Sequence, residues 1–128
     1  MRNYKMKTPK ELGYYFPAEW EKHESTWLAW PKDPDTFPKG IIGQVEETYI
    51  RIISALAKGE KVNLLVDDEE TKDKVLSMLP YKKKVLFHRI KSADVWVRDY
   101  GPIFVKKNSE IAATKWIFNS WGNKYKEL

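Results

Sequence analysis

A short segment of the chain combines side chains that could hold a flat organic cation. Residues 94–102 read Asp-Val-Trp-Val-Arg-Asp-Tyr-Gly-Pro, with carboxylates at Asp94 and Asp99, an indole at Trp96 and a guanidinium at Arg98. A carboxylate matches a planar guanidinium ligand with two parallel charge-assisted hydrogen bonds, and an aromatic face attracts the same cation. Asp99 and Trp96 are therefore suited to hold a guanidinium group.

Structural roles remain open for the same side chains. Arg98 and Asp99 could pair with neighbouring charges while Trp96 packs in the core. Asp94 could make a second acidic contact or form a turn, and the sequence favours neither role. Arg98 stays protonated and cannot act as a base, so we expect a buried structural cation or a partner that orients a carboxylate.

The spacing of Trp96 and Asp99 conflicts with a regular strand. Side chains alternate along a strand, so Trp96 and Arg98 would share one face while Asp99 lies on the other. Trp96 and Asp99 can meet one ligand only if the strand ends or bulges before Gly101 and Pro102, and these residue types favour such a break. We predict that Trp96 and Asp99 line one pocket.

The elements that must position this segment have an α/β pattern. Strands are predicted at residues 24–31, 61–66, 84–90, 94–99, 103–106 and 111–118. Apolar residues at helical spacing predict a helix over residues 41–56, which Gly59 ends and in which Glu46 faces solvent. Asp68 is expected to cap a second helix that Pro80 ends. The pattern alone predicts an α/β fold with a mixed sheet.

The length and composition fit one cytoplasmic domain. The chain has 128 residues, 42% of them apolar, and its 32% of charged residues are mixed in sign, which argues against disorder. We expect residues 1–10 to form a flexible tail. No apolar run approaches the ~20 residues that span a bilayer, so no membrane partner is predicted. The absence of cysteine agrees with a cytoplasmic location and excludes a disulfide framework.

Nucleic-acid binding and metal binding are both disfavoured. The net charge is +5, but the lysines are scattered, and the run at residues 82–84 fits a solvated strand edge. His23 and His88 lie far apart in the sequence and make a poor metal site. We therefore predict no nucleic-acid partner, no metal and no cofactor.

Four motifs in a fixed order point to a known family. They are Pro-Ala-Glu-Trp-Glu-Lys-His-Glu at residues 17–24, Thr-Trp-Leu-Ala-Trp-Pro at 26–31, Trp-Val-Arg-Asp-Tyr-Gly-Pro at 96–102 and Phe-Asn-Ser-Trp-Gly-Asn-Lys-Tyr at 118–125. With these motifs the chain resembles the agmatine deiminase and bacterial peptidyl-arginine deiminase family. Members of that family are well over twice as long as this chain.

The resemblance assigns roles to individual residues. It implies that Asp99 grips the guanidine nitrogens of the substrate and that Trp96 lines the pocket. It also implies that Asn119 and Trp121 lie in a segment that approaches the pocket. Trp27 and Trp30 point to opposite faces of their strand, and we favour Trp30 for the site because it stands at the strand end. Which of the two faces the site stays open. Arg98, Gly101 and Pro102 are expected to be structural residues near the site.

The resemblance also implies a fold. Family members have the pentein fold, a propeller of five αβ modules around a central site. This chain would supply the first module and part of the second, so residues 1–128 form a single partial pentein domain. Because an incomplete propeller exposes strand edges, we expect the chain to self-associate or to pair with the missing C-terminal modules.

The implied activity is the hydrolysis of a guanidine. In the family, a cysteine thiolate attacks the guanidine carbon, ammonia leaves, and water activated by a histidine releases a ureido product. The chain has no cysteine and no His-x-Asp element, so the catalytic residues are absent and the isolated chain is predicted to be inactive. We expect the N-terminal part of an agmatine deiminase, which forms N-carbamoylputrescine on the route to polyamines. The alternatives are a non-catalytic binding module derived from the family and a peptidyl-arginine deiminase. Whether the chain is a truncation, a proteolytic fragment or a natural short product stays open.

Overall fold

The chain divides into two units, which we describe separately. The computed structural model describes residues 7–92 and 94–123. One unit consists of residues 23–97, and the other combines the parts of the chain that flank it. In the described residues, no helix has both the length and the apolar character that a membrane crossing requires.

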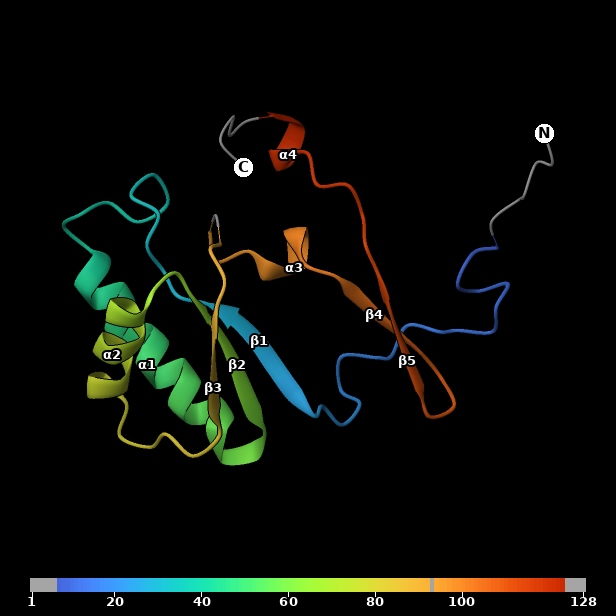
Figure 1. The fold of residues 1–128 in the computed structure, drawn as a ribbon, viewed down its shortest axis with the longest axis horizontal. Helices are drawn as coiled ribbons and strands as arrows, with labels where there is room; N and C mark the ends of the chain where they lie inside the picture. The colour runs from blue at the N-terminus through green and yellow to red at the C-terminus, as the bar shows by residue number, and fades with distance from the viewer. Residues whose placement is uncertain (1–6, 93, 124–128) are drawn as a thin grey trace. The chain divides into compact units, whose positions relative to one another are not determined.

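The unit of residues 23–97 is a parallel sheet with helices between its strands (Figure 1). The strands β1 (Ser25–Ala29), β2 (Lys61–Val66) and β3 (Val85–Arg89) lie in that order across the sheet, and both pairings are parallel. The helix α1 (Ile42–Gly59) connects β1 to β2, and α2 (Glu69–Met78) connects β2 to β3. The three predicted strands and both predicted helices of this unit are confirmed, with small shifts at their ends.

The core of this unit lies between the sheet and the two helices. Val62, Leu64 and Val66 alternate along β2, share one face and are fully buried. Ile53 of α1 and Val75 of α2 are equally buried against that face. The continuous apolar run of β2 is thus explained by its central position, with a neighbouring strand on each side.

One side of α1 differs from the prediction. Glu46, which we expected to face solvent, is buried, and its Oε1 atom accepts a hydrogen bond from Lys74 Nζ of α2 at 2.5 Å. Ile41 and Ile52, which we placed on the apolar stripe, are 44% and 41% exposed. Glu46 is buried because α2 packs beside it and supplies the cation of Lys74. The periodicity of the α1 sequence gives no information about this contact with another helix.

The second unit is built around a β-hairpin. The strands β4 (Ile103–Lys107) and β5 (Glu110–Thr114) pair antiparallel, and Asn108 in their turn has φ = +53°, a conformation that asparagine tolerates. Tyr15 bridges to Lys106. The predicted mixed sheet is therefore wrong, because the antiparallel pair forms a sheet separate from the parallel strands β1, β2 and β3. The predicted strand at 111–118 is also too long, since β5 ends at Thr114.

The N-terminal segment is described only in part. Residues 1–6 of the predicted tail lie outside the described residues. From Thr8 the chain forms turns, and the Glu11 carboxylate accepts hydrogen bonds from the backbone N–H of Thr8 at 2.8 Å and from its hydroxyl at 3.0 Å.

The N-terminus of α2 predicts a pH dependence of stability. The Oδ1 atom of Asp68 accepts a hydrogen bond from the Thr71 N–H at 2.7 Å, which confirms the predicted cap. Hydrogen bonding with the side chain of Thr71, and then with its backbone, lowers the pKa of Asp68 below its ordinary value of 3.8. A lowered pKa in the folded state means that this contribution is present above the ordinary pKa and is lost as pH falls through the folded value. We expect Asp68→Asn, which can still cap, to flatten the fall in melting temperature between about pH 4 and pH 2.

The control for this experiment is Asp73→Asn, which removes an exposed carboxylate from the same helix. This variant should keep the wild-type profile of melting temperature against pH. Identical profiles for Asp68→Asn and the wild type would contradict the role of the Asp68 charge.

Candidate functional site

The segment that carries Trp96 and Asp99 is not a strand. A bend at residues 94–95 leads into the single helical turn α3 (Val97–Tyr100), and the N–H of Val97 donates to the Val95 carbonyl at 2.8 Å. The predicted strand at 94–99 is therefore wrong, because the tight turn at Val95 breaks the extended backbone. Trp96 directly precedes this turn and Asp99 lies within it, so strand alternation does not set the directions of the two side chains.

The side chains of Trp96, Arg98 and Asp99 are all exposed. Trp96 is 52% exposed and Asp99 is exposed, so Trp96 is not a core residue. Arg98 Nη2 donates to Glu19 Oε1 at 3.1 Å, and both side chains are more than half exposed. The expected burial of Arg98 is thus wrong, whereas its expected pairing with a carboxylate is confirmed. Gly101 and Pro102 follow α3 and separate it from β4.

Asp94 is the most buried polar residue of the segment. Its side chain is 3% exposed, and Oδ2 accepts a hydrogen bond from the Thr36 hydroxyl at 2.7 Å. Oδ1 accepts one from the N–H of Val95 at 2.6 Å. Of the two roles that the sequence left open, these contacts support the turn-forming one.

The two tryptophans of the second motif, Trp27 and Trp30, have different surroundings. Trp30 is 5% exposed, belongs to the core cluster and meets the ring of Tyr49 edge-on at 6.2 Å. Trp27 is 39% exposed and stacks on His88 at 4.7 Å. His88 Nε2 lies 2.8 Å from Asn63 Oδ1, so this histidine has the structural, partly exposed position that we predicted.

The last motif forms a sharp turn. Asn119 Oδ1 accepts a hydrogen bond from the N–H of Gly122 at 3.1 Å, and Gly122 lies in the short segment α4 (Ser120–Asn123), whose backbone is non-helical at Trp121 and Gly122. Trp121 has φ = +54° and packs edge-on against Phe118 at 4.9 Å. For Trp116, a large apolar residue within the predicted strand at 111–118, the sequence favours plain core packing; it is 67% exposed, so that prediction is wrong. It lies beyond the end of β5, where no strand alternation directs its side chain inward.

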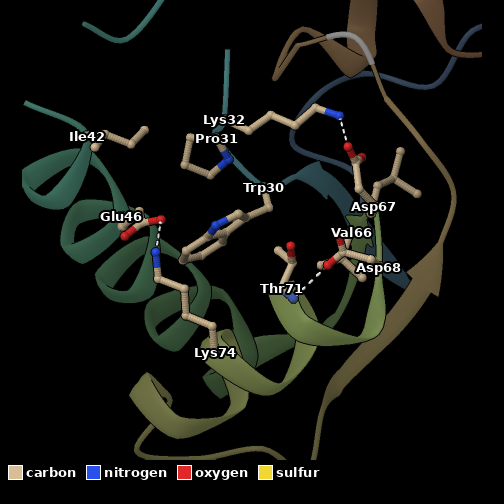
Figure 2. A pocket seen from close by; sticks show the side chains of 11 residues that line it. Trp30, Pro31, Lys32, Ile42, Glu46, Val66, Asp67, Asp68, Thr71 and Lys74 are labelled. Carbon is tan, nitrogen blue, oxygen red and sulfur yellow. Dashed lines mark hydrogen bonds and ion pairs between the residues drawn. The ribbon is translucent and has the colours of Figure 1, made fainter. Parts of the chain in front are cut away.

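A cavity of about 280 Å³ opens at the carboxyl ends of β1 and β2 (Figure 2). Figure 2 shows the indole of Trp30 between two ion pairs, Lys32 with Asp67 and Lys74 with Glu46. The sequence analysis did not single out Lys32 and Asp67. The sequence feature that could have identified them is their position directly after two of the parallel strands, because ligand sites of α/β folds are found at the carboxyl ends of such strands.

Comparison with known proteins assigns the chain to a family. A family model described as Porphyromonas-type peptidyl-arginine deiminase matches residues 15–128. The chain belongs to this family. The first 14 residues lie outside the match. In the described part of the chain, no three His, Asp or Glu side chains gather as a metal site would require.

Individual relatives agree with this assignment. A protein of Mycoplasma capricolum, provisionally named an agmatine deiminase, is 35% identical over 116 residues, which make up 90% of this chain and 31% of that protein. A Legionella pneumophila protein with the same provisional name is 34% identical over 120 residues, 91% of this chain and 33% of that protein. The chain thus spans about a third of the length of these relatives and matches their N-terminal part.

A solved structure shows that the fold is shared. It is a cysteine-to-serine variant of the agmatine deiminase of C. jejuni with substrate bound. The TM-score is 0.73 at 23% identity, over 88% of this chain and 32% of that one. The α/β arrangement described above is therefore a fold that agmatine deiminases contain.

Proposed function

We propose that this chain is the guanidinium-holding, N-terminal part of an agmatine deiminase. The observation that carries the proposal is the pair Trp96 and Asp99, an exposed indole directly before α3 and an exposed carboxylate within it. A carboxylate in such a position can accept two parallel hydrogen bonds from a guanidinium, while the indole face attracts the cation. Trp30, Asn119 and Trp121 remain further candidates for contacts with the substrate.

The proposed reaction converts agmatine and water into N-carbamoylputrescine and ammonia. Holding the guanidine in one orientation presents its carbon to the nucleophile, and such positioning contributes a large share of catalysis. The chain contains no cysteine, so it does not itself supply the thiolate that the family resemblance implies. Its proposed task is binding and orientation.

The fold proposal and the remaining expectations follow the same resemblance. We propose that residues 1–128 form the first module and part of the second module of a pentein propeller. The likeness to deiminase structures over about a third of their length supports this division. The cytoplasmic location and the polyamine route stay predictions.

Peptidyl-arginine is the second candidate substrate, because the matching family is described by that activity. Agmatine is preferred because the relatives carry the agmatine name. A competition between agmatine and an arginine-containing peptide distinguishes the two.

A binding titration tests the proposal. We expect agmatine to shift the NMR signals of the Trp96 indole with weak affinity, whereas putrescine, a dication without the guanidine, should shift them far less. The variant Asp99→Asn should abolish this difference between the two ligands. Equal responses to agmatine and putrescine in the unmodified chain would contradict a guanidinium site.

The exposed apolar side chains predict association. Ile117 is 99% exposed, Trp20 is 88% exposed and Trp116 is 67% exposed. Large apolar side chains that form a contiguous exposed patch mark surfaces that a partner covers. We expect light scattering to show concentration-dependent self-association of the isolated chain. A single monomeric species at all concentrations, with cooperative melting, would instead indicate that the 128 residues form a complete domain.

A further inference from the structure

The carboxylate of Asp94 joins two parts of the unit of residues 23–97. Thr36, whose hydroxyl donates to Asp94 Oδ2 at 2.7 Å, lies in the loop between β1 and α1. Val95, whose N–H donates to Oδ1 at 2.6 Å, leads directly into Trp96. Asp94 therefore connects the first loop to the segment that carries Trp96.

A second carboxylate connects the same loop and the same segment. Asp67 follows β2 and forms an ion pair with Lys32, which follows β1. The other oxygen of Asp67 accepts a hydrogen bond from the N–H of Ser92, which follows β3, at 3.3 Å. Asp67 and Asp94 thus connect the chain segments that follow β1, β2 and β3.

Because Asp94 is buried, its carboxylate requires hydrogen-bond partners within the protein. A buried carboxylate is costly unless hydrogen bonds satisfy it, so a small set of donors fixes its position. Thr36 is separated from Asp94 by 58 positions in the sequence, and this contact closes a long loop rather than a local turn. If Asp94 did no more than form a turn, the hydrogen bond from the Val95 N–H would be sufficient.

We propose that Asp94 is a positioning residue, which uses its hydrogen bond with Thr36 to fix the segment 94–96 so that Trp96 is presented to the guanidinium ligand. Asp94 acts through Trp96 and does not itself hold the ligand. The ligand part of this inference rests on the proposed function, whereas the positioning of Trp96 is measurable without any ligand.

Fluorine NMR of the chain labelled with 5-fluorotryptophan tests the inference. The resonance of Trp96 is assigned by its loss in Trp96→Phe. We expect Thr36→Val to shift or broaden this resonance and to weaken agmatine binding about tenfold, near the lower limit for losing one hydrogen bond to a charged group. Thr36→Ser keeps the hydroxyl and should restore both the resonance and the affinity.

The matched control is Thr48→Val, which removes an exposed hydroxyl that bonds to Gln44 within α1. It should leave the Trp96 resonance unchanged. If Thr36→Val fails to fold, Asp94→Asn takes its place, because the amide keeps the shape and only one acceptor oxygen. A Trp96 resonance that is the same in the Thr36 or Asp94 variant as in Thr48→Val would overturn the inference. A response of Trp96 to these variants in a chain that binds no agmatine would uphold the positioning role and refute the proposed function.

Discussion

Replacing Asp99 by asparagine is expected to lower kcat/KM for agmatine at least about tenfold in a complete enzyme. The amide keeps the shape of the side chain but loses the charge and one of the two acceptors that face the guanidinium. Loss of a charge-assisted hydrogen bond of roughly 1.5–3 kcal/mol accounts for this factor through binding alone. Misorientation of the guanidine carbon adds to the loss.

The assay uses a protein that joins residues 1–128 to the remaining two thirds of the Mycoplasma capricolum relative, where the family resemblance places the catalytic cysteine and histidine. Ammonia release at varied agmatine concentration gives kcat and KM. Asp73→Asn, which changes an exposed carboxylate of α2, is the matched control and should keep the activity of the parent. Parental activity in Asp99→Asn would refute the assignment of Asp99.

Truncation of Leu64 is expected to cost about 2–5 kcal/mol of stability. Leu64 is 0% exposed at the centre of β2 and pairs with Leu28 of β1 and Phe87 of β3. Leu64→Ala removes buried methyl groups and leaves a cavity that the neighbouring strands cannot fill. Since small domains are stable by roughly 5–15 kcal/mol, this is a large share of the total.

Urea unfolding of Leu64→Ala measures this cost through the unfolding midpoint. Leu86→Ala is the matched control because the same residue type lies on the edge strand β3 and is 47% exposed. We expect the control to lose less than half as much stability as Leu64→Ala. Equal losses would contradict the position of the core on the helix-covered face of β2.

The sequence predicted those elements whose local signals and tertiary surroundings agree. Residues 61–66 form β2 as predicted, because a continuous apolar run fits a central strand that is covered on its helix face. Asp68 caps α2 as predicted, because capping depends on neighbours within one turn. Both features are decided within a few residues, so periodicity and residue type suffice.

The failures have tertiary causes. The sequence Val-Trp-Val at residues 95–97 has the residue types of a strand. Asp94, however, accepts hydrogen bonds from the backbone of Val95 and from the distant Thr36, and these contacts favour a turn. Glu46 is buried because Lys74 of another helix reaches it. Such contacts join residues far apart in the sequence, and no local pattern contains them. Of the candidate site, the roles of Trp96 and Asp99 stay predictions from the sequence, and the contacts of Asp94 with Thr36 and Val95 were not predicted.

One measurement tests the central claim most directly: a crystal structure of the joined protein with agmatine bound. We predict that the guanidine nitrogens lie within hydrogen-bond distance of the Asp99 carboxylate and that the Trp96 indole lies beside the guanidine. A structure in which other carboxylates hold the guanidine, while Asp99 faces solvent, would contradict the claim.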